Sequence, residues 1–303
     1  MSGDASLSPA KRWFVSLRPY SFTASLMPAA LAAAIVLYRG DEALWWTFPL
    51  YALSALLFHA GTNVLNDYFD YRHGVDGPED EDPTHAITRG IVSPRFMLVS
   101  GHLYFVLGVL TGAPIALVRG GGFFAAGLAG AAGAYFYTNA RFSFKYVALG
   151  DLLVFLLMGP ALVVMGVWAL FGDVGASALL HSLPMALLVT AILHGNNLRN
   201  IGSDRAAGIS TVATLLGPAG SRSFFHVLIF LPFILLPGLV LVGPAPVTVL
   251  LTLPALAPAI SLSRTVRRAP DESDLMGLPM KTAQLHLLFT LLYVVGLVLG
   301  GLL

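Results

Sequence analysis

The sequence predicts an all-α, polytopic membrane protein in which nine transmembrane helices form one bundle. Of the 303 residues, 56% are hydrophobic and only 11% are charged, whereas soluble chains are about 25% charged. The apolar residues form stretches separated by charges, glycine and proline, and roughly 20 apolar residues suffice to span a bilayer. The net charge of +1 argues against a nucleic-acid-binding protein. The absence of cysteine excludes disulfides and cysteine-bound metals.

Nine stretches qualify as membrane spans, and we expect a single transmembrane domain over residues 1–303. The third and fourth stretches are separated only by Arg119 and the glycines at 120–122, which predicts a tight antiparallel hairpin. Residues 11–34 also fit a signal peptide, but their apolar run is long enough to span, so we expect an uncleaved first helix. In order, the expected spans are 20–38, 45–65, 97–118, 122–138, 147–170, 177–198, 223–242, 245–262 and 282–302.

The positive charges assign the two ends of the bundle. Cytoplasmic flanks of membrane proteins are enriched in Lys and Arg. With the N-terminus cytoplasmic, fifteen of the 17 Lys and Arg residues face the cytoplasm, and only Arg39 and Arg119 face outward. The sequence therefore predicts a multi-pass plasma-membrane protein with its C-terminus outside.

Two matching polar motifs end the second and the sixth expected spans. Each reads Asn-x3-Asp-x3-Gly, with Asn66 and Asp70 in the first motif and Asn200 and Asp204 in the second. Residues four apart share a helix face, so each motif should present an amide oxygen beside a carboxylate. Both helices run inward, and their C-terminal ends, which favour cations, should meet at the cytoplasmic mouth.

This arrangement predicts a site for Mg²⁺ and a diphosphate. Facing oxygen pairs suit a hard cation that takes few protein ligands and leaves the remainder to phosphate and water. Arg72, Arg199 and Arg205 lie among the acids and could bind phosphate oxygens, which would help to neutralise a diphosphate leaving group. Helix caps and solvated ion pairs are the alternative. The repetition of the motif favours a functional site. So do Asn63 and Asn197, because a polar side chain within an apolar membrane-spanning helix is unfavourable unless it lines a cavity or binds a ligand.

The long loop after the first motif is expected to close over the site. Together with the motif it forms a motif and cap-loop segment over residues 66–96, in which Arg89 is a candidate ligand contact. The acidic run at 79–82 is interpreted as solvated surface.

A second cytoplasmic loop carries Tyr137, Arg141 and Lys145. These residues fit either an interfacial aromatic belt or a pocket wall that stabilises a carbocation and binds an anion. Asp151 follows at the start of the fifth span as a further candidate, with a simple ion pair to Lys145 or Arg141 as the alternative. His73, His194 and His286, by contrast, have no metal-ligand spacing and are interpreted as structural.

The motifs resemble those of the UbiA superfamily of intramembrane aromatic prenyltransferases, over nearly the whole chain. Gly74 followed by Asp76 is similar to the MenA branch, which prenylates 1,4-dihydroxy-2-naphthoate in menaquinone synthesis, and to its animal relative that makes menaquinone-4. The segments that carry the resemblance are Asn66-Asp67-Tyr68-Phe69-Asp70, Asn196 to Gly208, Gly150-Asp151-Leu152 and Leu278 to Ala283.

The resemblance implies that Asn66, Asp70 and Asp204 coordinate Mg²⁺ and that Arg72 and Arg199 hold the diphosphate. Two positions depart from the family pattern, Asn200 in place of Asp and Ile209 in place of Lys. The expected catalytic residues are Asn66, Asp67, Asp70 and Asp204. The expected metal ligands are Asn66, Asp70, Asp76, Asn200 and Asp204. The expected substrate-binding residues are Asn63, Arg72, Arg89, Tyr137, Arg141, Lys145, Asp151, Asn197, Arg199 and Arg205.

The expected function is Mg²⁺-dependent transfer of a prenyl group from an isoprenyl diphosphate to an aromatic acceptor. The resemblance favours 1,4-dihydroxy-2-naphthoate with decarboxylation, and 4-hydroxybenzoate or a lipid alcohol remain alternatives. The signature of the phosphatidyl-alcohol transferases, Asp-Gly-x2-Ala-Arg, is absent from the sequence. A secondary transporter is also considered, although its polar groups should lie near the bilayer midplane rather than at one face.

Overall fold

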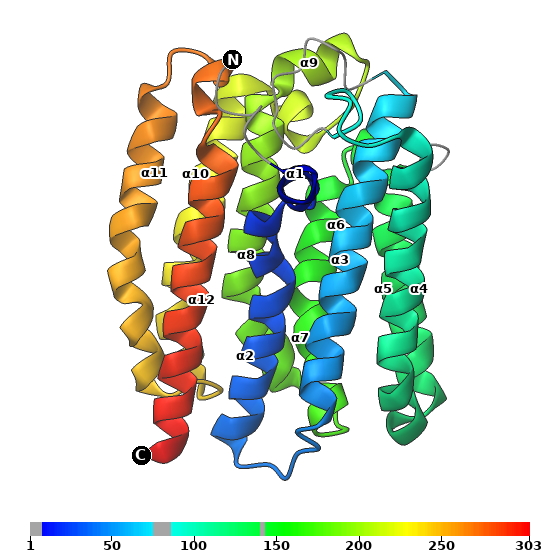
Figure 1. The fold of residues 1–303 in the computed structure, drawn as a ribbon. Coiled ribbons are helices and arrows are strands. Elements are labelled where there is room, and N and C mark those ends of the chain that lie inside the picture. Colours follow the sequence, from blue (N-terminus) through cyan, green and yellow to red (C-terminus); the bar gives the residue numbers. More distant parts are fainter. Residues whose placement is uncertain (1–7, 75–85, 140–142) are drawn as a thin grey trace.

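The computed structural model describes residues 8–74, 86–139 and 143–303, in which every regular element is a helix. The long helices run side by side and form one bundle (Figure 1). They are α2 (Thr23–Arg39), α3 (Thr47–Arg72), α4 (Pro94–Arg119), α5 (Gly121–Thr138), α6 (Gly150–Leu156), α7 (Leu162–Leu170), α8 (Ala176–Arg199), α10 (Val212–Val242), α11 (Leu256–Arg268) and α12 (Leu278–Leu302).

Eight segments within the described residues are long and apolar enough to cross a membrane. Helix α5, where the sequence predicts the fourth span, is not one of them, because its glycines and tyrosines lower its mean hydropathy. The all-helical membrane architecture is therefore confirmed, whereas the count of nine spans and the sidedness of the termini stay predictions.

The predicted hairpin between the third and fourth stretches is present. Helix α4 ends at Arg119, and Gly120 turns the chain with φ 86° and ψ 176°, a backbone conformation that favours glycine. The guanidinium of Arg119 donates hydrogen bonds to the carbonyl oxygens of Ala169 at 3.0 Å and Leu170 at 2.6 Å. Arg119 thereby caps the C-terminal end of α7 and ties the hairpin to the bundle.

One expected span is interrupted, and another is followed directly by a short separate helix. The fifth contains a π-helical turn, Leu157–Ala161, between α6 and α7, and this turn includes Pro160. The sixth ends at Arg199, after which the short helix α9 (Ile201–Ala206) begins. Breaks of this kind in a helix often accompany functional sites, and both lie close to the polar motifs.

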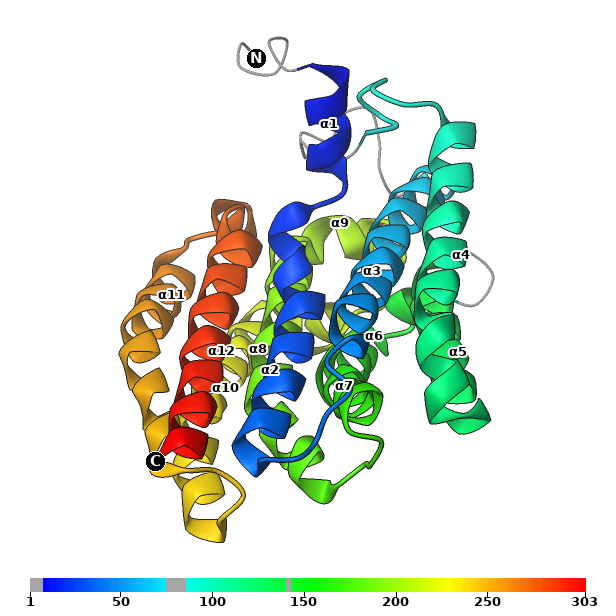
Figure 2. The ribbon, with the colours of Figure 1, turned by 60° about the horizontal axis from the view of Figure 1, so that its bottom comes forward.

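The helix α1 (Pro9–Ser16), which no expected span covers, lies at the same end of the bundle as α9. It is seen end-on in Figure 1, across the direction of the long helices, and Figure 2 shows it projecting beside the start of α4. Leu17 after α1 packs in one buried cluster with Val64, Ala86 and Met97. The described part of the cap loop is therefore held against α3 and α4. Its residues 75–85, including the acidic run, lie outside the described residues.

The opposite end of the bundle carries the two positive charges that the sequence places outside. Arg39 ends α2 and Arg119 ends α4, both at the end away from α9 (Figure 1). The largest buried cluster joins α2, α8, α10 and α12, with Leu31, Leu188 and Phe289 fully buried in it. The polar motifs lie outside this core, where α3, α5, α6 and α8 face one another.

Candidate active site

The first motif forms one connected cluster of polar side chains. Asn66 Nδ2 donates to Asp70 Oδ2 at 2.9 Å, so the two residues share a helix face as predicted. Lys145 Nζ donates to Asp70 Oδ2 at 2.6 Å and to Asn66 Oδ1 at 3.3 Å. Tyr146 OH donates to Asp70 Oδ1, and Thr138 Oγ1 donates to Asn66 Oδ1 at 3.1 Å. The buried oxygens of both residues therefore converge on the ammonium group of Lys145.

This donor set fits a small, hard cation. A carboxylate oxygen and an amide oxygen already bind the positive charge of Lys145, and Mg²⁺ prefers the same kinds of oxygen. Among the described residues, no group of three His, Asp or Glu side chains could hold a metal ion. A divalent ion bound here would therefore take amide oxygens and, for its remaining positions, oxygens of a phosphate or of water.

The second motif lies across a helix break. Asn200 separates α8 from α9 with φ −99° and ψ 12°, and its carbonyl accepts the first hydrogen bond of the new helix from Asp204 N at 2.9 Å. Arg199 Nε donates to Asn200 Oδ1 at 2.9 Å, and Arg199 Nη2 donates to Asn196 Oδ1 at 3.1 Å. The motif therefore follows directly on the end of the sixth expected span, and its own residues form the separate short helix α9.

Asp204 shares its electrostatic environment with the first motif. Its carboxyl is half-buried, and burial raises its pKa to about 6, with a further upward influence from Asp70. The positive charges of Lys145 and Arg199 act in the opposite direction. The carboxylates of both motifs thus lie close enough to influence each other.

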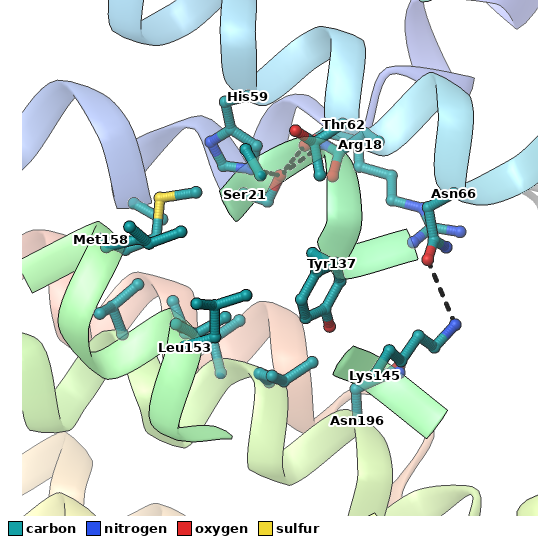
Figure 3. A pocket seen from close by; sticks show the side chains of 18 of the residues that line it. Arg18, Ser21, His59, Thr62, Asn66, Tyr137, Lys145, Leu153, Met158 and Asn196 are labelled. Carbon is teal, nitrogen blue, oxygen red and sulfur yellow. Dashed lines mark hydrogen bonds between the residues drawn. The ribbon is translucent and has the colours of Figure 1, made fainter. Parts of the chain in front are cut away.

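A cavity opens beside this cluster between α2, α3, α5, α6 and α8. One end of it is polar, with Arg18, Asn66 and Lys145, and the other end is lined by apolar residues of α6 and the π-helical turn. Figure 3 shows Tyr137 projecting between Lys145 on one side and Leu153 on the other. The cavity therefore joins a charged mouth to an apolar interior. The residues expected to bind substrate that line this cavity are Asn63, Tyr137 and Lys145.

Asp67 faces a different group of residues from Asp70. Its buried carboxylate accepts a hydrogen bond from Arg18 Nη2 at 3.3 Å and from the Ala86 backbone N–H at 3.1 Å. Arg18, which follows α1 with a left-handed φ of 56°, itself lines the cavity. Asp67 thus holds Arg18 and the cap loop against α3, and the structure does not place it beside Lys145.

Asp151 is buried beneath α8. It accepts hydrogen bonds from His194 Nδ1 at 2.6 Å and from Asn197 Nδ2 at 3.1 Å, while His194 Nε2 lies 2.9 Å from Ser221 Oγ. Neither Asp151 nor Asn197 is among the described residues that line the cavity. The described contacts of Lys145 are to the first motif, so the expected ion pair between Asp151 and Lys145 is not formed, and Asp151 contacts His194 and Asn197 instead.

The remaining expected residues are not brought to the cavity. Arg72 and Arg89 are exposed, and Arg205 donates to the carbonyl oxygen of Thr214 at 3.1 Å. Asp76 and Arg141 lie outside the described residues.

The sequence analysis did not select several residues that the structure places at the cavity. These include Arg18, Ser21, His59 and Thr62. His59 had a usable signal, because positions 59, 63, 66 and 70 recur at helical spacing on one face of α3. Arg18 and Ser21 gave none, since they reach the cavity only because the segment before α2 packs against α3.

Comparisons with known proteins show which family the chain resembles. The model of the UbiA prenyltransferase family matches residues 25–285. The chain is 34% identical over 299 residues to "UbiA prenyltransferase domain-containing protein 1" of Xenopus tropicalis, covering 95% of this chain and 82% of that protein. The human protein of the same name is 34% identical over 295 residues, with 95% and 83% covered. The Drosophila melanogaster homolog is 33% identical over 300 residues, with 94% and 79% covered.

Solved structures show the same fold. A UbiA homolog from Archaeoglobus fulgidus bound to GPP and Mg²⁺ has a TM-score of 0.68 at 19% identity, covering 96% of this chain and 99% of that chain. The apo structure of a UbiA homolog from Aeropyrum pernix K1 has a TM-score of 0.69 at 16% identity, with 93% and 98% covered.

The names of the curated relatives do not single out the MenA branch, so the expected branch and acceptor are not shown by these comparisons. The family match, in contrast, extends over most of the chain and includes both polar motifs. The chain belongs to the UbiA prenyltransferase family and is a prenyltransferase.

Proposed function

We propose that this prenyltransferase moves a prenyl group from an isoprenyl diphosphate to 1,4-dihydroxy-2-naphthoate, with Mg²⁺ and loss of CO₂, in menaquinone biosynthesis. The observation that carries the proposal is the ammonium of Lys145 bound by Asn66 and Asp70 at the mouth of a cavity with an apolar interior. A UbiA homolog solved with GPP and Mg²⁺ supports both the donor class and the ion. The apolar interior suits the hydrocarbon part of such a donor.

The charged mouth is suited to the departure of diphosphate. Lys145 and Arg18 supply positive charge on one side of the mouth, and Arg199 supplies it near Asn196 on the other. Mg²⁺ would be held by Asn66 with the carboxylates of both motifs, and would neutralise charge that develops on the diphosphate. When the bond between the allylic carbon and oxygen breaks, the electron pair leaves with the diphosphate, and these cations stabilise it.

The interior of the cavity is suited to the allylic cation and its acceptor. The ring of Tyr137 projects into it, and an aromatic face stabilises a nearby cation. The electron-rich acceptor ring forms the new carbon–carbon bond at its carboxyl-bearing carbon. The bond to the carboxylate then breaks, CO₂ leaves, and its electron pair restores the aromatic ring. Apolar walls such as Leu153 and Met158 exclude water that would otherwise capture the cation.

We place the motif end of the bundle at the cytoplasmic face of the plasma membrane. Arg39 and Arg119 lie at the other end, which supports the orientation that the positive charges predict.

Product analysis by mass spectrometry tests the proposal. Purified protein is incubated with Mg²⁺ and geranyl or farnesyl diphosphate, with 1,4-dihydroxy-2-naphthoate, 4-hydroxybenzoate or a lipid alcohol in separate reactions. A decarboxylated prenyl-naphthoquinol, detected as the quinone after oxidation by air during extraction, is expected with the wild type and not with Asp70→Asn. Product only with another acceptor would reject the naphthoate, and turnover that persists after chelation of Mg²⁺ would reject the ion.

A further inference from the structure

The backbone at Arg18 adopts an unusual conformation. Arg18 has φ 56° and ψ 56°, which is the left-handed region. Within the described residues, Ala148 is the one other residue besides glycine with a positive φ. This region is unfavourable for a residue with a Cβ. Such a conformation persists only where the surrounding structure holds it, and it often occurs at functional sites.

Asn63 on α3 holds the chain on both sides of Arg18. Its Nδ2 donates to the carbonyl oxygen of Leu17 at 3.0 Å and to Ser21 Oγ at 3.1 Å. An amide nitrogen carries two hydrogens, so both are used in these bonds. The remaining polar atom of the side chain, Oδ1, is an acceptor and cannot bind the oxygens of a diphosphate. Asn63 therefore donates to a substrate only if it releases this segment.

His59, one helical turn before Asn63, contacts the same segment. Its Nε2 lies 3.2 Å from Ser21 Oγ, and its Nδ1 lies 3.1 Å from Ser25 Oγ. Ser21 binds the carbonyl oxygen of Arg18 through its backbone N–H and through Oγ, both at 2.8 Å. Because the single hydroxyl hydrogen of Ser21 is donated to Arg18, its Oγ accepts from both Asn63 and His59. The two residues of α3 thus reach the backbone of Arg18 through one hydroxyl group.

The side chain of Arg18 extends to the charged end of the cavity. Its Nη2 donates to Asp67 Oδ1 at 3.3 Å, and Arg18 lines the cavity together with Asn66 and Lys145. Figure 3 shows Arg18 extending toward Asn66. A guanidinium binds phosphate oxygens in a fork geometry. The backbone of Arg18 therefore determines whether this group can meet a diphosphate at the mouth.

We propose that Asn63 and His59 are positioning residues, which fix the backbone of Arg18 so that its guanidinium binds the diphosphate. This inference rests on the proposed function, which places the diphosphate at this mouth. It changes the expected role of Asn63 from a contact with substrate to a contact that acts through Arg18. Asp67 holds the other end of the same arginine side chain.

A double-mutant cycle separates positioning from direct contact. Affinity for inorganic pyrophosphate with Mg²⁺ is measured by isothermal titration for the wild type, Arg18→Met, Asn63→Leu and the double variant. Arg18→Met removes a charged donor and should weaken pyrophosphate binding by about tenfold or more. Asn63→Leu should weaken it by about three- to tenfold alone, and by less than about twofold in the Arg18→Met background, because residues that act through one another are not additive. His59→Leu should follow the same pattern.

Two further variants separate the effect on Arg18 from a folding defect. Ser54→Ala removes a buried hydrogen bond to the carbonyl oxygen of Gly108, nine residues before Asn63 on the same helix. It should lower Tm and leave pyrophosphate affinity unchanged. Ser21→Ala removes only the hydroxyl that Asn63 and His59 both contact, and should reproduce part of the loss of affinity.

Three results would overturn the proposal. They are equal losses from Asn63→Leu with and without Arg18→Met, unchanged affinity in Arg18→Met, and unchanged affinity in both Asn63→Leu and Ser21→Ala. Each of them leaves the diphosphate site of the proposed function in place, because the wild type still binds pyrophosphate. A wild type that binds no pyrophosphate with Mg²⁺ would instead reject that site, and with it the role of Arg18.

Discussion

Lys145→Met tests two effects that we propose for this lysine. One is binding of the departing diphosphate, and the other is competition with Mg²⁺ for the oxygens of Asn66 and Asp70. The substitution keeps an unbranched side chain and removes the charge that bridges Asp70 and Asn66, in a pair whose side chains are 17% and 4% exposed. Hydrogen bonds to charged groups contribute about 1.5–3 kcal/mol. If Lys145 holds the departing diphosphate, its loss should lower kcat/KM by roughly 10- to 150-fold.

The same substitution should strengthen Mg²⁺ binding in the absence of substrate. The ammonium of Lys145 competes for the oxygens of Asn66 and Asp70, and an ion that no longer has to displace it should bind more tightly, by up to about tenfold. Isothermal titration with Mg²⁺ and steady-state kinetics measure the two effects, with Lys281→Met at an exposed lysine as the control. Unchanged Mg²⁺ affinity together with unchanged turnover would refute the assigned role of Lys145.

Three further predictions follow from the same geometry. The pKa of Asp204 is about 6, above the ordinary carboxyl value, so its protonation should weaken Mg²⁺ binding as the pH falls below about 6. Mg²⁺ affinity measured over a series of pH values checks this, and Asp204→Asn should make the affinity less dependent on pH. His194→Leu leaves the buried Asp151 carboxyl without its 2.6 Å hydrogen bond and should lower the free energy of unfolding by about 1–3 kcal/mol, visible as a fall in Tm that the double replacement with Asp151→Leu largely restores. Gly159→Ala forces a methyl group against Ala186 and should lower the free energy of unfolding by about 1–3 kcal/mol. Thermal unfolding measures this change, and an unchanged Tm would contradict the close packing of Gly159 against Ala186.

Local rules explain the parts of the site that the sequence predicts well. Asn66 and Asp70 bond each other because residues one turn apart on any α-helix face the same side. Lys145 was selected as an anion ligand from its place in a cytoplasmic loop, and the structure puts it at the cavity with Tyr137.

The errors arise where neighbouring helices decide the outcome. Asp151 was expected at the pocket, but α6 is turned so that this carboxylate meets His194. This contact joins residues that are 43 positions apart in the sequence, so no local pattern predicts it.

The sequence by itself determined the membrane class, the helices, the hairpin at Gly120 and the pairing within the first motif. These depend on composition, on apolar length and on the period of the α-helix, all of which are local properties. Only the tertiary structure decided which side of each helix faces the cavity, because helices that are apolar all round carry little information about their own rotation. The place of Arg18 beside Asp67 and the hydrogen bonds of Asn63 to Leu17 and Ser21 exist only once separate helices have packed together.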